Sequence, residues 1–374
     1  MESKANNVDI KQKNRTAVFQ LFRSHHRLSR QDIVTKLDLS LPTVTQNLRQ
    51  LILEGLVEEA GSFGNTGGRR AKAYSLISSA RTAIGLDITQ HHVTAVAVDL
   101  LGSIIASRRH RILFSRTEDY RRFLGDAVAQ IISEAKLSTD SILGVGIGVP
   151  GLITPDNRRI SYGEVLGVTG ATCDEFSQHI PYDTTLYHDT DAASFAEMWV
   201  SSGIQNAFYL MLSASVGGTI YIDGKRYAGS DLRAGEVGHM MAVPGGRRCY
   251  CGKLGCVDPY CAAPVLSSAS GGDLRQFFHL LTLGDPHIRS VWEDYLDHLT
   301  TVVANLRMLF DCDIIIGGYV GSCIGAHIQD LYARLDQRSP FEMGAAYVHP
   351  CRCKTEAVAA GAALNHIAAF LDSI

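Results

Sequence analysis

Residues 142–151 read ILGVGIGVPG, an apolar run of strand length that leads into a glycine-rich turn. The segments before it alternate between strand and helix patterns. Residues 84–89 and 93–99 predict a β-hairpin. Residues 102–106 predict a third strand, and residues 119–136 predict a helix. This order of a hairpin, a third strand, a helix and a buried strand indicates an α/β domain.

The length and composition are those of an ordinary globular protein. The chain has 374 residues, of which 46% are hydrophobic and 20% charged, with 35 Gly against 10 Pro. These values exclude a disordered chain, a collagen and a coiled-coil rod. No run of about 18 apolar residues occurs, and the first residues contain no apolar core of a signal peptide. We therefore expect a cytoplasmic protein with no membrane segment.

Charge is divided unevenly along the chain. The first 78 residues carry 12 Lys and Arg against 7 Asp and Glu, a net charge of +5, whereas the other 296 carry 23 against 31, a net charge of −8. A basic block on an acidic body is expected where one part binds a polyanion such as DNA. The nine cysteines, an odd number, do not suggest a disulfide framework in a reducing compartment, which leaves metal binding or burial.

Three helices are predicted within the basic block of residues 1–78. Apolar residues at helical spacing mark two of them at residues 14–24 and 29–37, and a third between Ser40 and Gly55. Two short helices joined by a tight turn make a helix-turn-helix candidate. The third helix would expose side chains that hydrogen-bond base edges and phosphates, namely Thr43, Thr45, Gln46, Asn47 and Arg49.

A wing is predicted after the third helix. Residues 56–58 and 73–76 read as short strands around a glycine-rich tip that ends in Arg69 and Arg70, which could reach phosphates or the minor groove. A purely structural helical bundle is the alternative, but the charge, the wing and the polar third helix favour DNA binding. Over roughly residues 12–78 the chain resembles winged helix-turn-helix domains of bacterial repressors, in which LSLPTVTQNLRQLILEGLVEE-like and GGRR segments occur together.

One histidine and three cysteines have the spacing of metal ligands. His239, Cys249, Cys251 and Cys256 follow the pattern H-x9-C-x-C-x4-C, with glycines inside it that allow a tight turn. Three thiolates and one imidazole suit tetrahedral Zn²⁺ in a closed, structural site. A chance spacing in a cysteine-rich chain is the alternative. The other five cysteines are expected to be core or surface thiols.

Five segments of the body occur in a characteristic order. They are GIGVPG (146–151), HDTDAASFAE (188–197), AGEVGHM (234–240), CYCGKLGC (249–256) and IIIGG (314–318). Over about residues 82–370 this order resembles the ROK family of sugar kinases and repressors. The added amino-terminal winged helix is similar to the repressor branch of that family.

The resemblance implies a two-lobed α/β body of the actin and hexokinase type, preceded by the winged helix-turn-helix domain. The first lobe would comprise residues 79–190 and about 360–374, and the second lobe residues 191–359, with the zinc site and a dimerisation surface. A sugar or sugar-phosphate effector would bind between the lobes. The implied assembly is a homodimer or homotetramer on operator DNA.

The resemblance also assigns sugar-binding residues. Asp189 stands at the position of the kinases' catalytic base, and Glu236 and His239 match residues that hold sugar hydroxyls. His239 would serve zinc with one ring nitrogen and the sugar with the other. His188 stands where the family has Asn, and Asp258 stands where it has Glu, so Asp258 is expected to reach a hydroxyl only through water. An ordinary N-cap or surface carboxylate is the alternative for Asp189 and Glu236.

The phosphate-binding turns of the kinases are altered. Their Asp-x-Gly-Gly-Thr turn reads DITQH at residues 87–91, and their second glycine-rich turn reads SASVGGT at residues 213–219. Backbone N–H groups approach phosphates closely where glycine leaves room, so both changes argue against phosphoryl transfer. We therefore expect no catalytic residue in use.

These observations predict a sugar-responsive, DNA-binding transcriptional regulator of carbohydrate genes that acts as a repressor. An ATP-dependent sugar kinase with an added DNA-binding domain is the alternative, because Asp87 and Asp189 are retained. A DNA-binding protein with a zinc-stabilised body and no effector is a third hypothesis.

Overall fold

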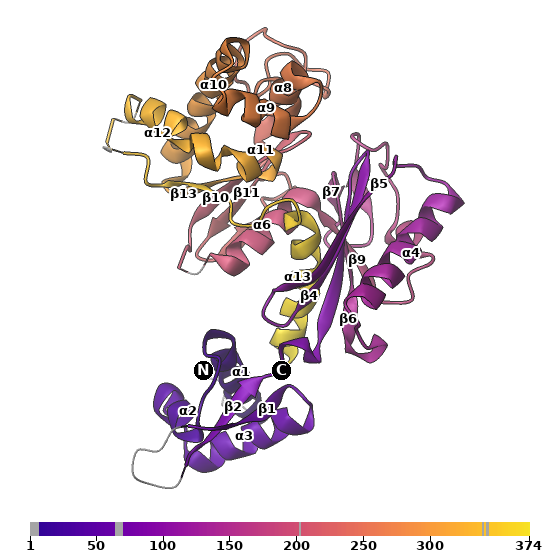
Figure 1. Cartoon of the computed structure of the whole chain (residues 1–374), viewed down its shortest axis with the longest axis vertical. Helices are drawn as coiled ribbons and strands as arrows, with labels where there is room; N and C mark the ends of the chain where they lie inside the picture. Colours follow the sequence, from indigo (N-terminus) through magenta and orange to yellow (C-terminus); the bar gives the residue numbers. More distant parts are fainter. Residues whose placement is uncertain (1–6, 64–69, 202, 339, 342–343) are drawn as a thin grey trace.

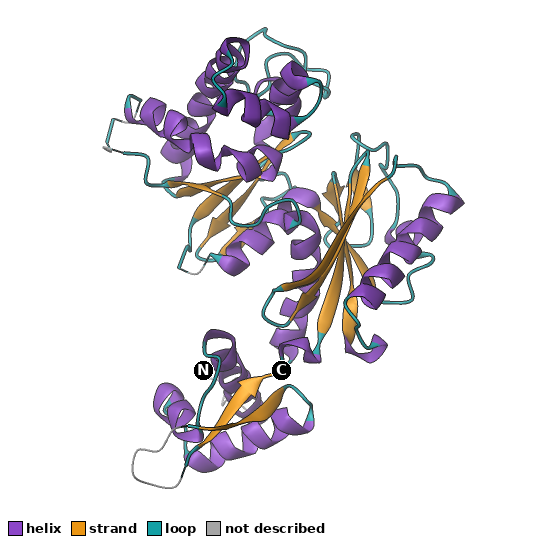
Figure 2. Ribbon diagram, viewed as in Figure 1, coloured by secondary structure: helices purple, strands orange, loops and turns teal. Residues whose placement is uncertain are grey.

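The computed structural model describes residues 7–63, 70–201, 203–338, 340–341 and 344–374. The chain forms a small N-terminal domain and two α/β lobes, each built around its own sheet (Figure 1). Figure 2 shows that helices cover both sheets of the body. Within the described ranges, no helix combines the length and the apolar character that a membrane crossing needs. The predicted winged helix followed by a two-lobed α/β body is confirmed.

The N-terminal domain contains three helices and a two-stranded wing. Ser29 and Ser40 cap the second and third helices, as predicted, and the side chain of Ser40 accepts a hydrogen bond from the Thr43 N–H. The first helix begins earlier than the predicted residue 14, because the polar stretch before that residue is compatible with a helix although it lacks an apolar stripe. The elements are α1 (Asn7–Ser24), α2 (Arg30–Leu37), α3 (Leu41–Leu53), β1 (Val57–Ser62) and β2 (Lys72–Leu76).

The first lobe is a five-stranded mixed sheet in the order β5-β4-β3-β6-β9. The predicted hairpin is β3 and β4, and β6 and β9 run parallel to β3. Helix α4 packs against the sheet, and the short elements β7, β8 and α5 follow β6. The bounds are β3 (Thr82–Ile88), β4 (His92–Asp99), β5 (Ile104–Arg111), α4 (Glu118–Glu134), β6 (Ile142–Val149), β7 (Leu152–Ile153), β8 (Ile160–Tyr162), α5 (Cys173–Ser177) and β9 (Thr184–His188).

The glycines of β6 allow a helix to lie directly on the sheet. A Cβ atom at Gly146 would lie 2.1 Å from the Ala362 carbonyl oxygen of α13 (Ala357–Ser373), and one at Gly148 would lie 2.4 Å from a methyl of Val358. Gly144 faces His366 of the same helix in the same way. The alternating glycines therefore set the distance between β6 and the C-terminal helix.

The second lobe is a five-stranded sheet in the order β12-β11-β10-β13-β14, with a helical layer. Trp292, Tyr295 and Phe277 are fully buried in its core. The bounds are β10 (Ala207–Leu212), β11 (Val216–Ile222), β12 (Lys225–Tyr227), α7 (Asp258–Cys261), α8 (Ala263–Ser267), α9 (Leu274–Thr282), α10 (Pro286–Phe310), β13 (Asp313–Gly317), α11 (Gly318–Cys323), α12 (Ile328–Asp336) and β14 (Val348–Pro350).

Two helices connect the three parts. Helix α6 (Asp189–Val200) follows β9 directly and packs against α13 between the lobes (Figure 1). The other end of α13 meets the N-terminal domain, where Gln12 donates a hydrogen bond to the Ser373 carbonyl oxygen at 2.8 Å. Apolar side chains of α1, α2, α3 and α13 form one continuous buried cluster. The N-terminal domain is therefore packed onto the first lobe.

Candidate functional site

A pocket opens between the lobes where β9 passes into α6. Its walls come from the turn after β6 and residues 162–165 in the first lobe, and from β11 and the segment with the predicted metal ligands in the second. The structure brings four of the five predicted sugar-binding residues to this pocket: His188, Asp189, Glu236 and His239.

Asp258, the fifth predicted residue, does not line the pocket. Its carboxylate is buried and accepts a hydrogen bond from the Val216 N–H at 2.7 Å. Burial raises the pKa of Asp258, and this hydrogen bond opposes the rise. Because Val216 itself lines the pocket, Asp258 supports the pocket wall from behind, and its contact with a sugar through water stays a prediction.

His188 lies between two carboxylates. Its Nε2 is 3.2 Å from Asp189 Oδ1, and its Nδ1 is 3.7 Å from Asp191 Oδ2. Arg226 of β12 is 2.7 Å from the same Asp191 oxygen, and the Thr219 hydroxyl donates to the other oxygen at 3.1 Å. Sequence reasoning missed Asp191 and Arg226, because only the fold brings the edge strand β12 to the start of α6.

This arrangement sets the charges of the pocket. Burial opposes a charge on His188, but the hydrogen bond to Asp191 and the charges of both carboxylates outweigh it and raise the His188 pKa to about 9. Burial raises the pKa of Asp189, and His188 opposes that rise. For Asp191 the effects of His188, Arg226 and Thr219 exceed that of burial, so its pKa is lowered. At neutral pH His188 is therefore an imidazolium that lies between Asp189 and Asp191.

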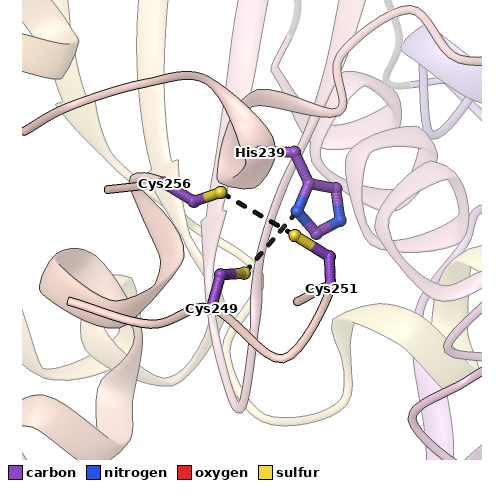
Figure 3. A group of neighbouring side chains, drawn as sticks. All are labelled: His239, Cys249, Cys251 and Cys256. Carbon is purple, nitrogen blue, oxygen red and sulfur yellow. Dashed lines mark hydrogen bonds between the residues drawn. The ribbon is translucent and has the colours of Figure 1, made fainter. Parts of the chain in front are cut away.

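The four predicted metal ligands converge in the second lobe (Figure 3). Their ligand atoms all lie within 4.8 Å of one another. The sulfurs of Cys251 and Cys256 are 3.8 Å apart, as are Cys249 Sγ and His239 Nδ1. Two sulfurs bound to one tetrahedral Zn²⁺ at ~2.3 Å would lie about 3.8 Å apart. The cluster thus fits a tetrahedral metal ion in both donor type and spacing.

Tyr250 connects the cluster to the pocket. It lies between two of the cysteines, lines the pocket, and places its hydroxyl 3.2 Å from His239 Nε2. The same ring turns Nδ1 towards Cys249 (Figure 3). His239 therefore presents Nδ1 to the thiols and Nε2 to the pocket side. There Nε2 contacts the hydroxyl of Tyr250, a residue that the sequence analysis did not predict.

A second pocket adjoins the first where the kinases' phosphate turns are expected. It shares Asp189 and Ser215 with the first pocket, and both altered turns line it. The Arg109 guanidinium of the first lobe lies 5.9 Å from the ring centre of Tyr319 in the second lobe. Residues from both lobes therefore meet beside the second pocket.

Replacing Asp87, which lines this second pocket, should stabilise the protein at alkaline pH. Burial and the charge of Asp189 raise its pKa to about 7, with Arg109 opposing. A raised pKa means that folding stability is lost as pH rises from about 4, the unfolded value, to about 7. Asp87→Asn should therefore raise the free energy of unfolding at pH 8 by about 1–3 kcal/mol.

The gain from Asp87→Asn should vanish near pH 4, where the carboxyl is protonated in both states. Thermal unfolding at both pH values measures this difference, with Asp140→Asn on the exposed surface as the control. If Asp87→Asn is less stable than the parent at pH 8, burial of the ionised Asp87 carboxylate does not destabilise the folded protein.

Five of the seven predicted DNA-binding side chains lie on one helix of the N-terminal domain. Figure 1 places α3 on the side of this domain that faces away from the lobes. Its central apolar side chains are buried, whereas Gln46 and Arg49 are exposed and Thr43, Thr45 and Asn47 are partly exposed. Arg70 of the wing is exposed, and Arg69 lies outside the described residues.

Helix α6 joins the pocket to the N-terminal domain. It begins at Asp189 in the pocket, and near its other end the Arg23 guanidinium of α1 lies 4.2 Å from the centre of the Trp199 ring. Between them, the buried Glu197 carboxylate accepts hydrogen bonds of 2.9–3.0 Å from the backbone N–H groups of Arg352 and Cys353. Glu197 thus fastens the segment that leads from β14 to α13.

Two kinds of known protein are similar to this chain. The DNA-binding transcriptional dual regulator NagC of Escherichia coli strain K12 is 27% identical over 281 residues, 74% of this chain and 69% of that protein. A solved ROK family transcriptional regulator, a homolog of the E. coli MLC protein, superposes with a TM-score of 0.75 at 22% identity over 97% of both chains. The ROK hexokinase of Thermus thermophilus superposes with a TM-score of 0.62 at 23% identity, over 78% of this chain and 99% of that one.

The two structural likenesses establish the fold, and one of them extends over the N-terminal domain as well as the body. The family model for ROK matches residues 83–365, which include the pocket, the cluster and both connecting helices except the end of α13. The chain belongs to the ROK family.

Proposed function

We propose that this protein is a DNA-binding transcriptional regulator that represses carbohydrate genes and responds to a sugar bound between its lobes. The observation that carries the proposal is that one helix, α6, begins in the pocket and ends against the DNA-binding domain. The similarity to NagC, a DNA-binding transcriptional regulator, supports it.

The pocket has the groups that recognise sugar hydroxyls. Asp189 and Glu236 offer carboxylate oxygens to hydroxyl donors, and His188 lies against Asp189 with Nε2 3.2 Å from Oδ1. On sugar binding, His239 would exchange the Tyr250 hydroxyl for one from the ligand. Tyr162 and Tyr250, both about half exposed, line the same pocket and can pack on a sugar ring.

Zinc is the metal that we propose for the His/Cys cluster. His239, Cys249, Cys251 and Cys256 would fill all four positions of a tetrahedral site, so the ion would stabilise the loop and perform no catalysis. His239 would be held in one orientation in the pocket wall.

Sugar binding would be transmitted through the two connecting helices. Closure of the second lobe on a sugar moves the segment after β14, and Glu197 passes that movement to α6. Trp199 and α13 then change the position of the N-terminal domain. We propose a homodimer or homotetramer, so that such movements alter the spacing of two α3 helices on an operator.

We also propose that kinase activity has been lost. The segment 87–91 has no glycine to admit a triphosphate, and Arg109 and Tyr319 meet across the adjoining pocket. The test is ADP formation with Mg-ATP and a sugar panel. Sugar-dependent ADP formation that is abolished by Asp189→Asn would establish the kinase alternative instead.

Removing one positive charge from α3 should weaken operator binding. Arg49→Ala is expected to reduce affinity by about tenfold and to make the dependence of log affinity on log salt concentration shallower by about one. Fluorescence anisotropy with a duplex selected from the genome by the purified protein measures both quantities. Arg122→Ala, an exposed charge on α4, is the matched control. An unchanged salt slope would remove Arg49 from the phosphate contacts.

The same duplex tests the regulator as a whole. Operator affinity is measured with and without saturating free hexoses, pentoses, N-acetylhexosamines and their phosphates. A sugar that changes affinity supports the proposal. If no sugar changes either operator affinity or thermal stability, the protein is a constitutive DNA-binding protein, the third hypothesis.

A further inference from the structure

The pocket between the lobes is acidic. Glu164, Asp189 and Glu236 contribute three carboxyl groups to its lining. All of its lining residues belong to the described part of the chain, and none of them is Lys or Arg. A phosphate group that entered this pocket would meet carboxylates with no arginine or lysine to pair with.

The positive charge of His188 is not available to pair with a phosphate in this acidic pocket. Its two ring nitrogens already face Asp189 and Asp191, at 3.2 and 3.7 Å. Arg226, on the second-lobe side of this group, is paired with Asp191 at 2.7 Å and does not line the pocket. Both cations therefore neutralise carboxylates of the protein itself.

A phosphate that extended out of the pocket would also meet carboxylates. Towards the adjoining second pocket it would pass Asp189 and approach the buried Asp87, on which the charge of Arg109 acts. Lys354, which lines that second pocket, donates to the Cys351 carbonyl oxygen at 2.8 Å. Towards solvent it would pass Glu164, which is exposed.

We propose that the effector is an uncharged, unphosphorylated sugar, and that Glu164 is a residue that rejects sugar phosphates and sugar acids. This inference rests on the proposed function and narrows it to one class of ligand. Hydroxyl groups donate to carboxylates, whereas a phosphate dianion accepts hydrogen bonds and is repelled by them. The same lining thus favours a neutral sugar and disfavours its phosphate.

Calorimetric titration of the full chain with matched ligands tests the proposal. The pairs are glucose and glucose 6-phosphate, N-acetylglucosamine and its 6-phosphate, and xylose and its 5-phosphate, with glucuronate as a sugar acid. We expect at least one neutral sugar to bind, with its phosphate weaker by on the order of 100-fold. A phosphate that binds as tightly as its free sugar, or more tightly, overturns this inference while leaving the sugar-responsive function in place.

Glu164→Gln removes the negative charge of this side chain and keeps its size and shape, so it tests whether the charge excludes phosphates. The variant should reduce the preference for the free sugar over its phosphate by about tenfold, because one repelling charge is removed. Asp140→Asn, an exposed carboxylate elsewhere in the first lobe, should leave the preference unchanged. A Glu164→Gln preference equal to that of the parent refutes the role of Glu164. Absence of binding by every ligand of the panel refutes the proposed sugar response itself, and this inference with it.

Discussion

Cys251→Ser should abolish binding of the metal ion that we propose for the His/Cys cluster and lower the Tm by on the order of 5–10 °C. The cysteine supplies one of four ligand atoms that lie within 4.8 Å of one another, and a serine hydroxyl is a poor ligand for zinc. Without the ion, the loop that carries His239 and Tyr250 loses its cross-link. Elemental analysis of the purified protein and thermal unfolding measure the two effects.

The consequences of Cys251→Ser should be confined to the body. Sugar binding should weaken, because two pocket residues belong to the loop, whereas operator binding by the N-terminal domain should persist. Cys323→Ser, a partly exposed cysteine outside the cluster, is the matched control. A metal content equal to that of the parent would eliminate the cluster as the metal site.

Glu197→Gln should separate sugar binding from DNA binding. The carboxylate accepts hydrogen bonds from the N–H groups of Arg352 and Cys353 and from the Ser201 hydroxyl. An amide has one oxygen in place of two, so at least one buried donor loses its partner. We expect the variant to bind sugar and operator, while the effect of sugar on operator affinity falls from about 5–150-fold to less than about threefold.

Anisotropy titrations of operator with and without saturating sugar measure this coupling. Glu134→Gln, which removes a surface carboxylate paired with Arg108, should leave it intact. Trp199→Phe provides a second variant, since it removes the hydrogen bond from the indole N–H to the Leu101 carbonyl oxygen while keeping an aromatic ring. Full coupling in a folded Glu197→Gln protein would show that the signal does not pass through this carboxylate.

Local sequence patterns predicted the features that depend on near neighbours. Ser29 and Ser40 begin helices because a serine cap needs only the residues three positions later. The metal ligands were found because three of the four lie within eight residues and the turns between them contain glycine. Strands β3 and β4 were found from their alternation and the short turn between them.

Contacts between distant segments could not be predicted in this way. Arg226 reaches Asp191 because the edge strand β12 lies beside the start of α6, and no spacing in the sequence encodes that approach. Glu197 lies inside one of the recognised motifs, yet its partners are 155 and 156 residues away. A motif position likewise did not show that the Asp258 carboxylate accepts a hydrogen bond from the Val216 N–H.

The glycines of β6 have a consequence for motion. Because backbone carbonyl and side-chain atoms of α13 fill the space where Cβ atoms would stand, α13 has no room to slide or rotate on β6. The first lobe and α13 are therefore expected to move as one unit. Cleft closure would then move the second lobe relative to this unit and bend the two connections between them, the one from α6 to β10 and the short segment that Glu197 holds between β14 and α13.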